Sequence, residues 1–134
     1  MAGFQWAGST DGSEPVIREF TVKASAVISR GEMCNLETGE ADAGATNDAA
    51  FLGPATEAVD NTVDGHTVEI ITNPGAIYSV VDNNARVAGA LLDLASGGLG
   101  VTTDSNHDFI VWADSSATEP TLVAWYGNHA FGWA

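Results

Sequence analysis

The chain has 134 residues, of which 45% are hydrophobic and 16% charged, a composition that suits one folded domain and excludes a wholly disordered chain. Eighteen acidic residues against four Lys and Arg give a formal net charge of -14. Because nucleic-acid binding needs a basic surface along the phosphate backbone, we expect no direct nucleic-acid binding. One cysteine excludes an internal disulfide, and no apolar run is long enough to span a membrane.

The first fifteen residues, "MAGFQWAGSTDGSEP", predict an extended N-terminal arm ahead of a single domain over residues 16–134. The segment mixes Gly, Ser, Thr and Asp with two isolated aromatic residues, Phe4 and Trp6, and ends at Pro15. It lacks the basic start and apolar stretch of an export signal. We therefore expect a protein that is not secreted.

From residue 16 onward the sequence predicts strands. In "PVIREFTVKASAVI" an alternating pattern places Phe20, Val22 and Ala24 on one face and polar residues on the other. Further β-branched or aromatic runs follow, separated by Gly, Pro and Asn turns, at residues 32–37, 49–55, 66–72, 76–82, 90–94, 100–104, 108–114 and 121–127. The pattern predicts an all-β fold, a compact antiparallel barrel or sandwich, β-tulip-like, of roughly eight short strands.

One segment, "DNNARVAGALLDLAS" at residues 82–96, also fits a helix. It begins with residues that can cap a helix and carries spaced apolar side chains. Gly89 in its middle costs about 1 kcal/mol relative to Ala. We therefore expect at most one short helix, near residues 83–88, and a strand after it.

The single cysteine, in "EMCNLE", is interpreted as a core residue. A period of two places Cys34 and Leu36 on the same face of a strand between two turns that contain Gly31 and Gly39. A reactive thiolate needs a neighbouring His, another cation or a helix N-terminus, and the nearest histidine in sequence is His66. Cys34 is thus expected to be buried and structural.

No motif indicates catalysis or a bound cofactor. The histidines His66, His107 and His129 stand in three separate settings, with no pair at the i, i+4 spacing of a zinc site. "ASGGLG" lacks the Lys-Ser/Thr of a phosphate-binding loop, and no G-x-S-x-G occurs. We predict that the protein is not an enzyme and has no catalytic residue, no cofactor and no metal site.

"DNTVDGH" resembles part of a calcium-binding loop. Asp60, Asp64 and Gly65 fall at the first, fifth and sixth positions of such a loop, but Thr62 and Ile71 stand where ligands are needed at the third and twelfth. Incidental calcium binding by this acidic chain stays an open alternative.

The distribution of aromatic residues points to the two ends of the chain. Six of the eleven lie in the first six or last ten residues, namely Phe4, Trp6, Trp125, Tyr126, Phe131 and Trp133. Terminal segments are normally polar, so these rings should be buried, either against the chain's own domain or against a partner. We favour a partner, because Trp and Tyr are common anchors of interfaces and an arm can add a strand to a sheet edge.

The order of these motifs resembles the head decoration proteins of tailed phages, also called capsid cement or stabilising proteins. The resemblance rests on the [IV]-x-x-G-[DE] turn at Ile28–Glu32, the hairpin at Gly39 and "AAFLG" at residues 49–53, and it extends over residues 17–131.

That resemblance implies a protein made in the host cytoplasm that forms a homotrimer on the outer capsid surface of the virion, where it bridges and stabilises major capsid protein subunits. It also implies an N-terminal arm that orders on the capsid, here residues 2–17. The implied capsid contacts in the arm are Phe4, Trp6, Pro15, Val16 and Ile17. To these the end-of-chain pattern adds Trp125, Tyr126, Phe131 and Trp133. We then expect deletion of residues 2–15 to leave a folded domain that binds capsids more weakly.

A different class of function fits the same aromatic residues. In a glycan- or ligand-binding β-module, such as an adhesion domain, exposed Trp112, Trp125 and Trp133 would stack on sugar rings. A monomer that binds glycans would support this alternative, and a trimer that binds only capsids would support the decoration protein.

Overall fold

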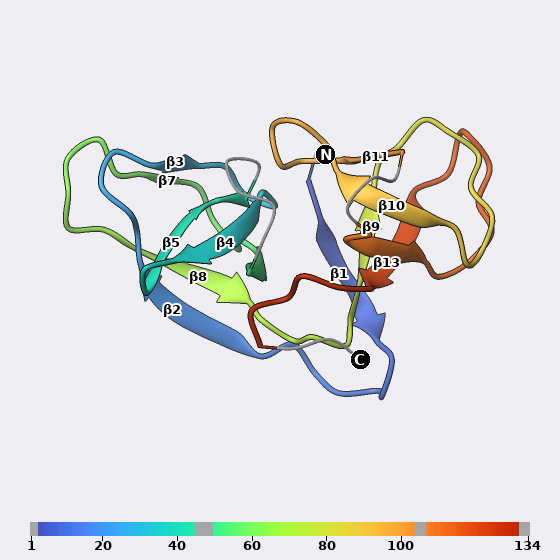
Figure 1. The fold of residues 1–134 in the computed structure, drawn as a ribbon, viewed down its shortest axis with the longest axis horizontal. Coiled ribbons are helices and arrows are strands. Elements are labelled where there is room, and N and C mark those ends of the chain that lie inside the picture. The colour runs from blue at the N-terminus through green and yellow to red at the C-terminus, as the bar shows by residue number, and fades with distance from the viewer. Residues whose placement is uncertain (1–2, 45–49, 104–106, 132–134) are drawn as a thin grey trace.

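The strands of the protein gather in two lobes that lie side by side (Figure 1). The computed structural model describes residues 3–44, 50–103 and 107–131. The first lobe is one six-stranded sheet with the order β1-β9-β13-β12-β10-β11. Its strands are β1 (Gln5–Ser9), β9 (Ala76–Val80), β10 (Leu91–Leu94), β11 (Val101–Thr103), β12 (Phe109–Val111) and β13 (Thr121–Trp125).

The second lobe consists of three small sheets, with the orders β2-β8, β3-β7 and β5-β4-β6. Its strands are β2 (Ile17–Thr21), β3 (Val27–Ile28), β4 (Met33–Glu37), β5 (Glu40–Ala43), β6 (Phe51–Pro54), β7 (Val59–Asp60) and β8 (Thr67–Ile71). All pairings between these named strands are antiparallel. The predicted all-β class is confirmed, although no sheet closes into a barrel within the described ranges.

Every predicted run corresponds to a strand, and four further strands, β1, β3, β5 and β7, bring the number in the described residues to thirteen instead of roughly eight. β3 and β7 have two residues each, and β5 is the return strand of a hairpin. At that hairpin Thr38 and Gly39 both have positive φ, 50° and 83°, which is the type I′ geometry that matches the twist of paired strands. The predicted turn at Gly39 is thereby confirmed.

Two hydrophobic cores stabilise the lobes. They are adjacent at β4 and β6, whose side chains contribute to both cores. The first core includes Tyr78, Phe109 and Trp125 of the six-stranded sheet together with Met33 and Phe51 from β4 and β6. The Phe51 and Trp125 rings stack with centroids 5.6 Å apart, so the lobes share buried aromatic area.

The second core contains the cysteine. Cys34 is fully buried among residues of β3, β6 and β8, and Leu36 packs at the edge of the same cluster. The prediction that both side chains face the core is confirmed. Burial also raises the pKa of the Cys34 thiol far above its ordinary value, which keeps it protonated and unreactive.

Gly53, the last residue of "AAFLG", permits a close crossing of two strands. Its φ is +141°, and a Cβ at this position would lie 1.8 Å from the carbonyl oxygen of Ile71 in β8. Only glycine allows β6 to pass this close to β8.

Residues 83–88 form no helix. The backbone N–H and C=O of Arg86 both pair with Ser115 at 3.0 Å, so this segment uses its hydrogen bonds on a distant part of the chain. The Arg86 guanidinium also pairs with the Asp82 carboxylate. The strand expected after Gly89 is present as β10.

The segment expected to form an arm contributes a strand to the first lobe. Residues Gln5–Ser9 form β1, which pairs with β9 and contains an irregularity between Trp6 and Gly8. Phe4 is 3% exposed and packs on Phe109 and Tyr78 at 5.4 and 6.1 Å between ring centroids. Residues 10–15 are exposed and connect β1 to β2. In the described part of the chain, no helix has the length and apolar character that crossing a bilayer requires.

Candidate functional site

The structure divides the predicted contact residues into a buried and an exposed group. Phe4 and Trp125 are each 3% exposed and belong to the first core. Trp6 is partly buried against the same core. These three aromatic side chains therefore pack against the chain's own domain, which is the first of the two environments that the sequence leaves open for them. Trp133 lies outside the described residues.

Val16 and Ile17 are exposed at the start of β2, with 46% and 49% of their surface accessible. Their backbone is fixed by its neighbours: the Val16 N–H donates to Asn73 Oδ1 at 2.6 Å, and the Val16 carbonyl accepts from Thr72 N–H at 2.9 Å. Pro15 precedes them and is also exposed. These apolar side chains are therefore presented to solvent from an ordered backbone.

Phe131 reaches the same strand from the other end of the chain. It is 44% exposed, and the Arg18 guanidinium lies over its ring, 4.8 Å from the centroid. In Figure 1 the C-terminal segment passes beside the start of β2. We call Val16, Ile17, Arg18 and Phe131 the β2–Phe131 surface.

His129 fixes the position of Phe131. The Phe131 N–H donates to His129 Nδ1 at 3.1 Å, so the proton of the neutral ring lies on Nε2, which donates to the Leu52 carbonyl at 3.0 Å. Burial lowers the pKa of His129 to about 4, and the Leu52 hydrogen bond opposes this shift. A protonated His129 could not accept from Phe131, so the neutral form holds the C-terminal segment in place.

Tyr126 is the remaining predicted contact, and it is 46% exposed just after β13. Its backbone N–H donates to the Asp108 carbonyl, and its ring meets His107 edge-on with centroids 6.1 Å apart. No described contact joins Tyr126 to the β2–Phe131 surface.

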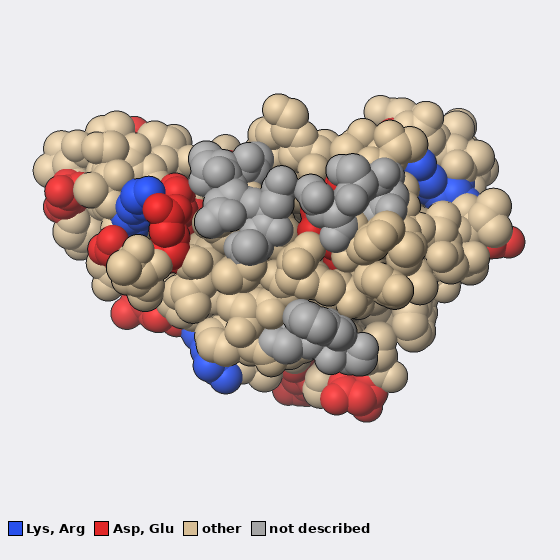
Figure 2. All heavy atoms as spheres, in the orientation of Figure 1, with Lys and Arg blue, Asp and Glu red and all other residues tan. Residues whose placement is uncertain are grey.

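Acidic side chains form no single patch on the face in Figure 2, where they lie in separate groups, mostly toward the periphery. Within residues 3–44, 50–103 and 107–131, no three His, Cys, Asp or Glu side chains lie close enough together to hold a metal ion.

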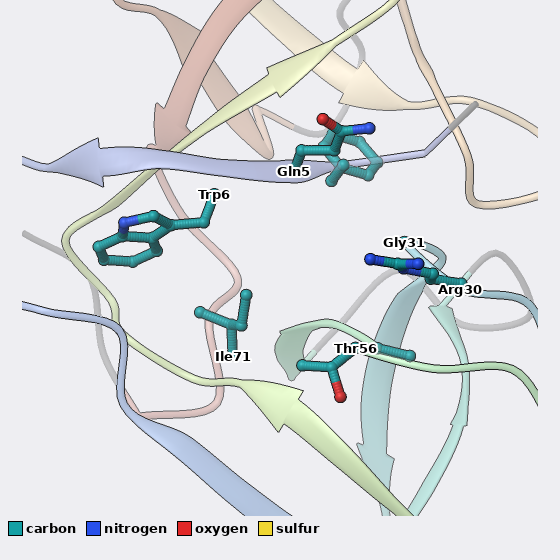
Figure 3. A pocket seen from close by; sticks show the side chains of 8 residues that line it. Gln5, Trp6, Arg30, Gly31, Thr56 and Ile71 are labelled. Atoms are coloured by element: carbon teal, nitrogen blue, oxygen red, sulfur yellow. The ribbon is translucent and has the colours of Figure 1, made fainter. Parts of the chain in front are cut away.

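A pocket of about 330 Å³ lies where the two lobes meet (Figure 3). β1 forms one side of it, and β8 and the turn before β4 form the others. It is lined by Phe4, Gln5, Trp6, Arg30, Gly31, Ala55, Thr56 and Ile71.

Gly31 fixes the shape of this pocket. Its φ is +78°, its carbonyl accepts from Phe4 N–H at 2.8 Å, and its own N–H donates to the Ala55 carbonyl at 2.8 Å. A Cβ on Gly31 would approach the backbone of Gly3 and Phe4 to 3.2 Å. The [IV]-x-x-G-[DE] turn thus clamps β1 to the second lobe and places Arg30 at the pocket.

Sequence reasoning did not find this pocket. Phe4 and Trp6 are predicted partner contacts, and Arg30 and Gly31 belong to the [IV]-x-x-G-[DE] turn, but no sequence pattern predicts that these segments meet. Only the fold brings them together.

No protein-family model matches the sequence, and a search of curated proteins gives no significant match. The structure defines the class of protein, an all-β domain of two lobes with an exposed apolar surface at β2 and a pocket between the lobes. The resemblance to decoration proteins remains a prediction about the particular family.

Proposed function

We propose that the protein is a structural component of a virus particle that binds the outer surface of a phage capsid and stabilises it by bridging major capsid protein subunits. The observation that carries this proposal is the β2–Phe131 surface, where segments from both ends of the chain expose apolar side chains from an ordered backbone.

The edge of β2 adds to this surface. Among the described strands β2 pairs along its length only with β8, and Val22, just past its end, bridges to Ala41 of β5. The part of its other edge ahead of that bridge can accept a strand from a partner. Exposed apolar groups beside a free edge are an aggregation hazard in a protein that works alone, and they fit one that is covered by a partner.

The charge of the protein supports a position on the outer surface of the capsid. A net charge of -14 and only four basic residues would oppose contact with packaged DNA and suit a surface in contact with solvent. As a trimer, several weak contacts would act together, because the second and third contacts form at high effective concentration. In this role the protein would need no catalytic residue and no cofactor.

The buried positions of Phe4 and Trp125 shorten the list of proposed contacts. Val16, Ile17 and Phe131 become the main ones, with Pro15 next to Val16 in sequence and Tyr126 as a separate exposed contact just after β13. Phe4 and Trp125 are proposed to act indirectly, through the stability of the first lobe.

A direct test is co-sedimentation with expanded capsids of the capsid protein encoded in the same genome. We expect the double variant Val16→Ser, Ile17→Ser to bind at least about tenfold more weakly, since truncating a buried interface anchor costs 2 kcal/mol or more. The matched control is Val63→Ser, Val87→Ser, two valines that are 76% and 69% exposed elsewhere. Equal binding by the two double variants would refute the role of the β2–Phe131 surface.

A glycan-binding module is the second candidate, and exposed Trp112 favours it. Trp112 is 48% exposed, whereas Trp125 is buried and cannot stack on a sugar. A glycan screen with wild type and Trp112→Ala, together with the mass of the protein in solution, separates the candidates. A monomer whose glycan binding depends on Trp112 would replace the capsid proposal.

A further inference from the structure

The pocket between the lobes contains a cation that has no partner in the described part of the protein. Lys23 and Arg86 form ion pairs with carboxylates, and Arg18 lies over an aromatic ring. Arg30 has no ion pair, side-chain hydrogen bond or ring contact with any described residue. Figure 3 shows its side chain extending from the turn before β4 toward the middle of the pocket.

Gln5 supplies a second free donor to the pocket. Its side-chain amide lies on the β1 side (Figure 3) and forms no hydrogen bond with a described residue. No Asp or Glu is among the described residues that line the pocket. In a chain with a net charge of -14, this pocket therefore carries a local positive charge and two unused donors.

The rest of the lining is mostly apolar. Trp6 and Ile71 lie next to each other on the side away from Arg30, and Phe4, Ala55 and Gly31 add to the lining. Thr56 contributes a hydroxyl, which donates to the Glu69 carbonyl at 3.2 Å. Trp6 is partly buried against the first core, so its indole is a rigid surface that costs little entropy to use. An apolar wall opposite convergent donors is the usual composition of a small-molecule site.

We propose that this pocket binds a small organic acid in which a carboxylate is attached to a single six-membered ring. The carboxylate accepts hydrogen bonds from the Arg30 guanidinium, whose paired N–H groups match its two oxygens, and from the Gln5 amide. The ring lies against Trp6 and Ile71. The cavity volume, about 330 Å³, is at the small end of ligand pockets and suits one ring rather than a chain of sugars.

Two sources share this chemistry, an aromatic acid and a uronic-acid sugar. The experiment is an NMR titration of the full-length ¹⁵N-labelled protein with benzoate and with glucuronate. Neutral benzamide and glucose are the matched ligands without the charge. The buffer contains about 0.15 M salt, which screens the repulsion of anions by the whole acidic protein beyond about 8 Å.

We expect at least one acid to shift the signals of Gln5, Trp6, Arg30 and Ile71 with a dissociation constant on the order of 1 mM, and the neutral ligands to bind at least about tenfold more weakly. Arg30→Gln should weaken binding of the acid by about tenfold or more. Lys23→Gln removes the same charge outside both the pocket lining and the β2–Phe131 surface, and it should leave the affinity unchanged.

The acid that binds identifies the source, and binding by both would assign the site to ring carboxylates in general. The proposal is overturned if neither acid shifts the pocket signals, if neutral ligands bind equally well, or if Lys23→Gln and Arg30→Gln weaken binding equally. Because Arg30 is exposed, its substitution should leave the fold intact, and unchanged spectra away from the pocket would verify this. Capsid binding is measured separately, so either proposal can fail without the other.

Discussion

Replacing Phe4 tests whether the N-terminal segment is part of the folded domain. The side chain is 3% exposed and packs on Phe109 and Tyr78. Phe-to-Ala changes in protein cores cost about 3–5 kcal/mol, from lost burial and the cavity that remains. Since a domain of this size has a total stability of about 5–15 kcal/mol, Phe4→Ala should lose a large part of it.

The assay is urea unfolding followed by circular dichroism. The matched control, Val63→Ala, truncates a side chain that is 76% exposed and should change the free energy of unfolding by less than about 0.5 kcal/mol. Deletion of residues 2–15 also removes β1 from its pairing with β9, so on the structure we expect it to destabilise the domain at least as much as Phe4→Ala. A free energy of unfolding within about 1 kcal/mol of wild type for both changes would refute this reasoning and restore the free arm that the sequence predicts.

Three further predictions concern single residues. Gly53→Ala should destabilise the protein by about 3 kcal/mol or more in urea unfolding, because the added Cβ meets backbone at 1.8 Å, whereas Gly39→Ala, with positive φ and open space, should cost about 1–2 kcal/mol. Cys34 should react with a thiol reagent only in denaturant, because burial raises its pKa. The pKa of His129 is about 4 in the folded protein and 6.5 ordinarily. Its contribution to the free energy of unfolding is therefore complete above pH 6.5 and falls by up to about 3 kcal/mol as the pH drops toward 4.

Each of these predictions has a contradicting result. Equal costs at Gly53 and Gly39 would mean that β6 does not cross β8 this closely. Rapid labelling of the native thiol would contradict the burial of Cys34. For the histidine, stability is measured against pH in wild type, His129→Gln and the control His66→Gln, which changes an exposed residue. Loss of the pH dependence in the His66 variant, and its retention in the His129 variant, would contradict the assignment.

The strands of this fold were predictable where local pattern and packing agree. The β4–β5 hairpin follows from Gly39 and the alternation around Cys34, and β8 and β9 follow from runs of β-branched residues. β1 was missed because Gln5–Ser9 has no β-branched residue and is irregular at Gly8. That segment forms a strand because it pairs with β9. A local sequence pattern carries no information about such a distant partner.

In the candidate sites, too, local sequence patterns predict some features and tertiary contacts decide the others. The sequence identified aromatic residues at both ends, but it could not separate Phe4 and Trp125, which enter the core, from Phe131, which stays 44% exposed, since tertiary contacts decide burial. Val16 and Ile17 are expected contacts only through the resemblance to decoration proteins, because no local pattern marks them as exposed. Arg30 is predicted only as part of a turn, because its guanidinium, which has no partner among the described residues, becomes notable only when the pocket around it is known.

A cryo-EM reconstruction of capsids incubated with the protein tests the proposed function most directly. It should show density for the two-lobed domain on the outer capsid surface, at local threefold positions where capsid protein subunits meet, with the β2–Phe131 surface against the capsid. Capsids that show no added density at saturating protein, or density that leaves Val16, Ile17 and Phe131 facing solvent, would contradict the account.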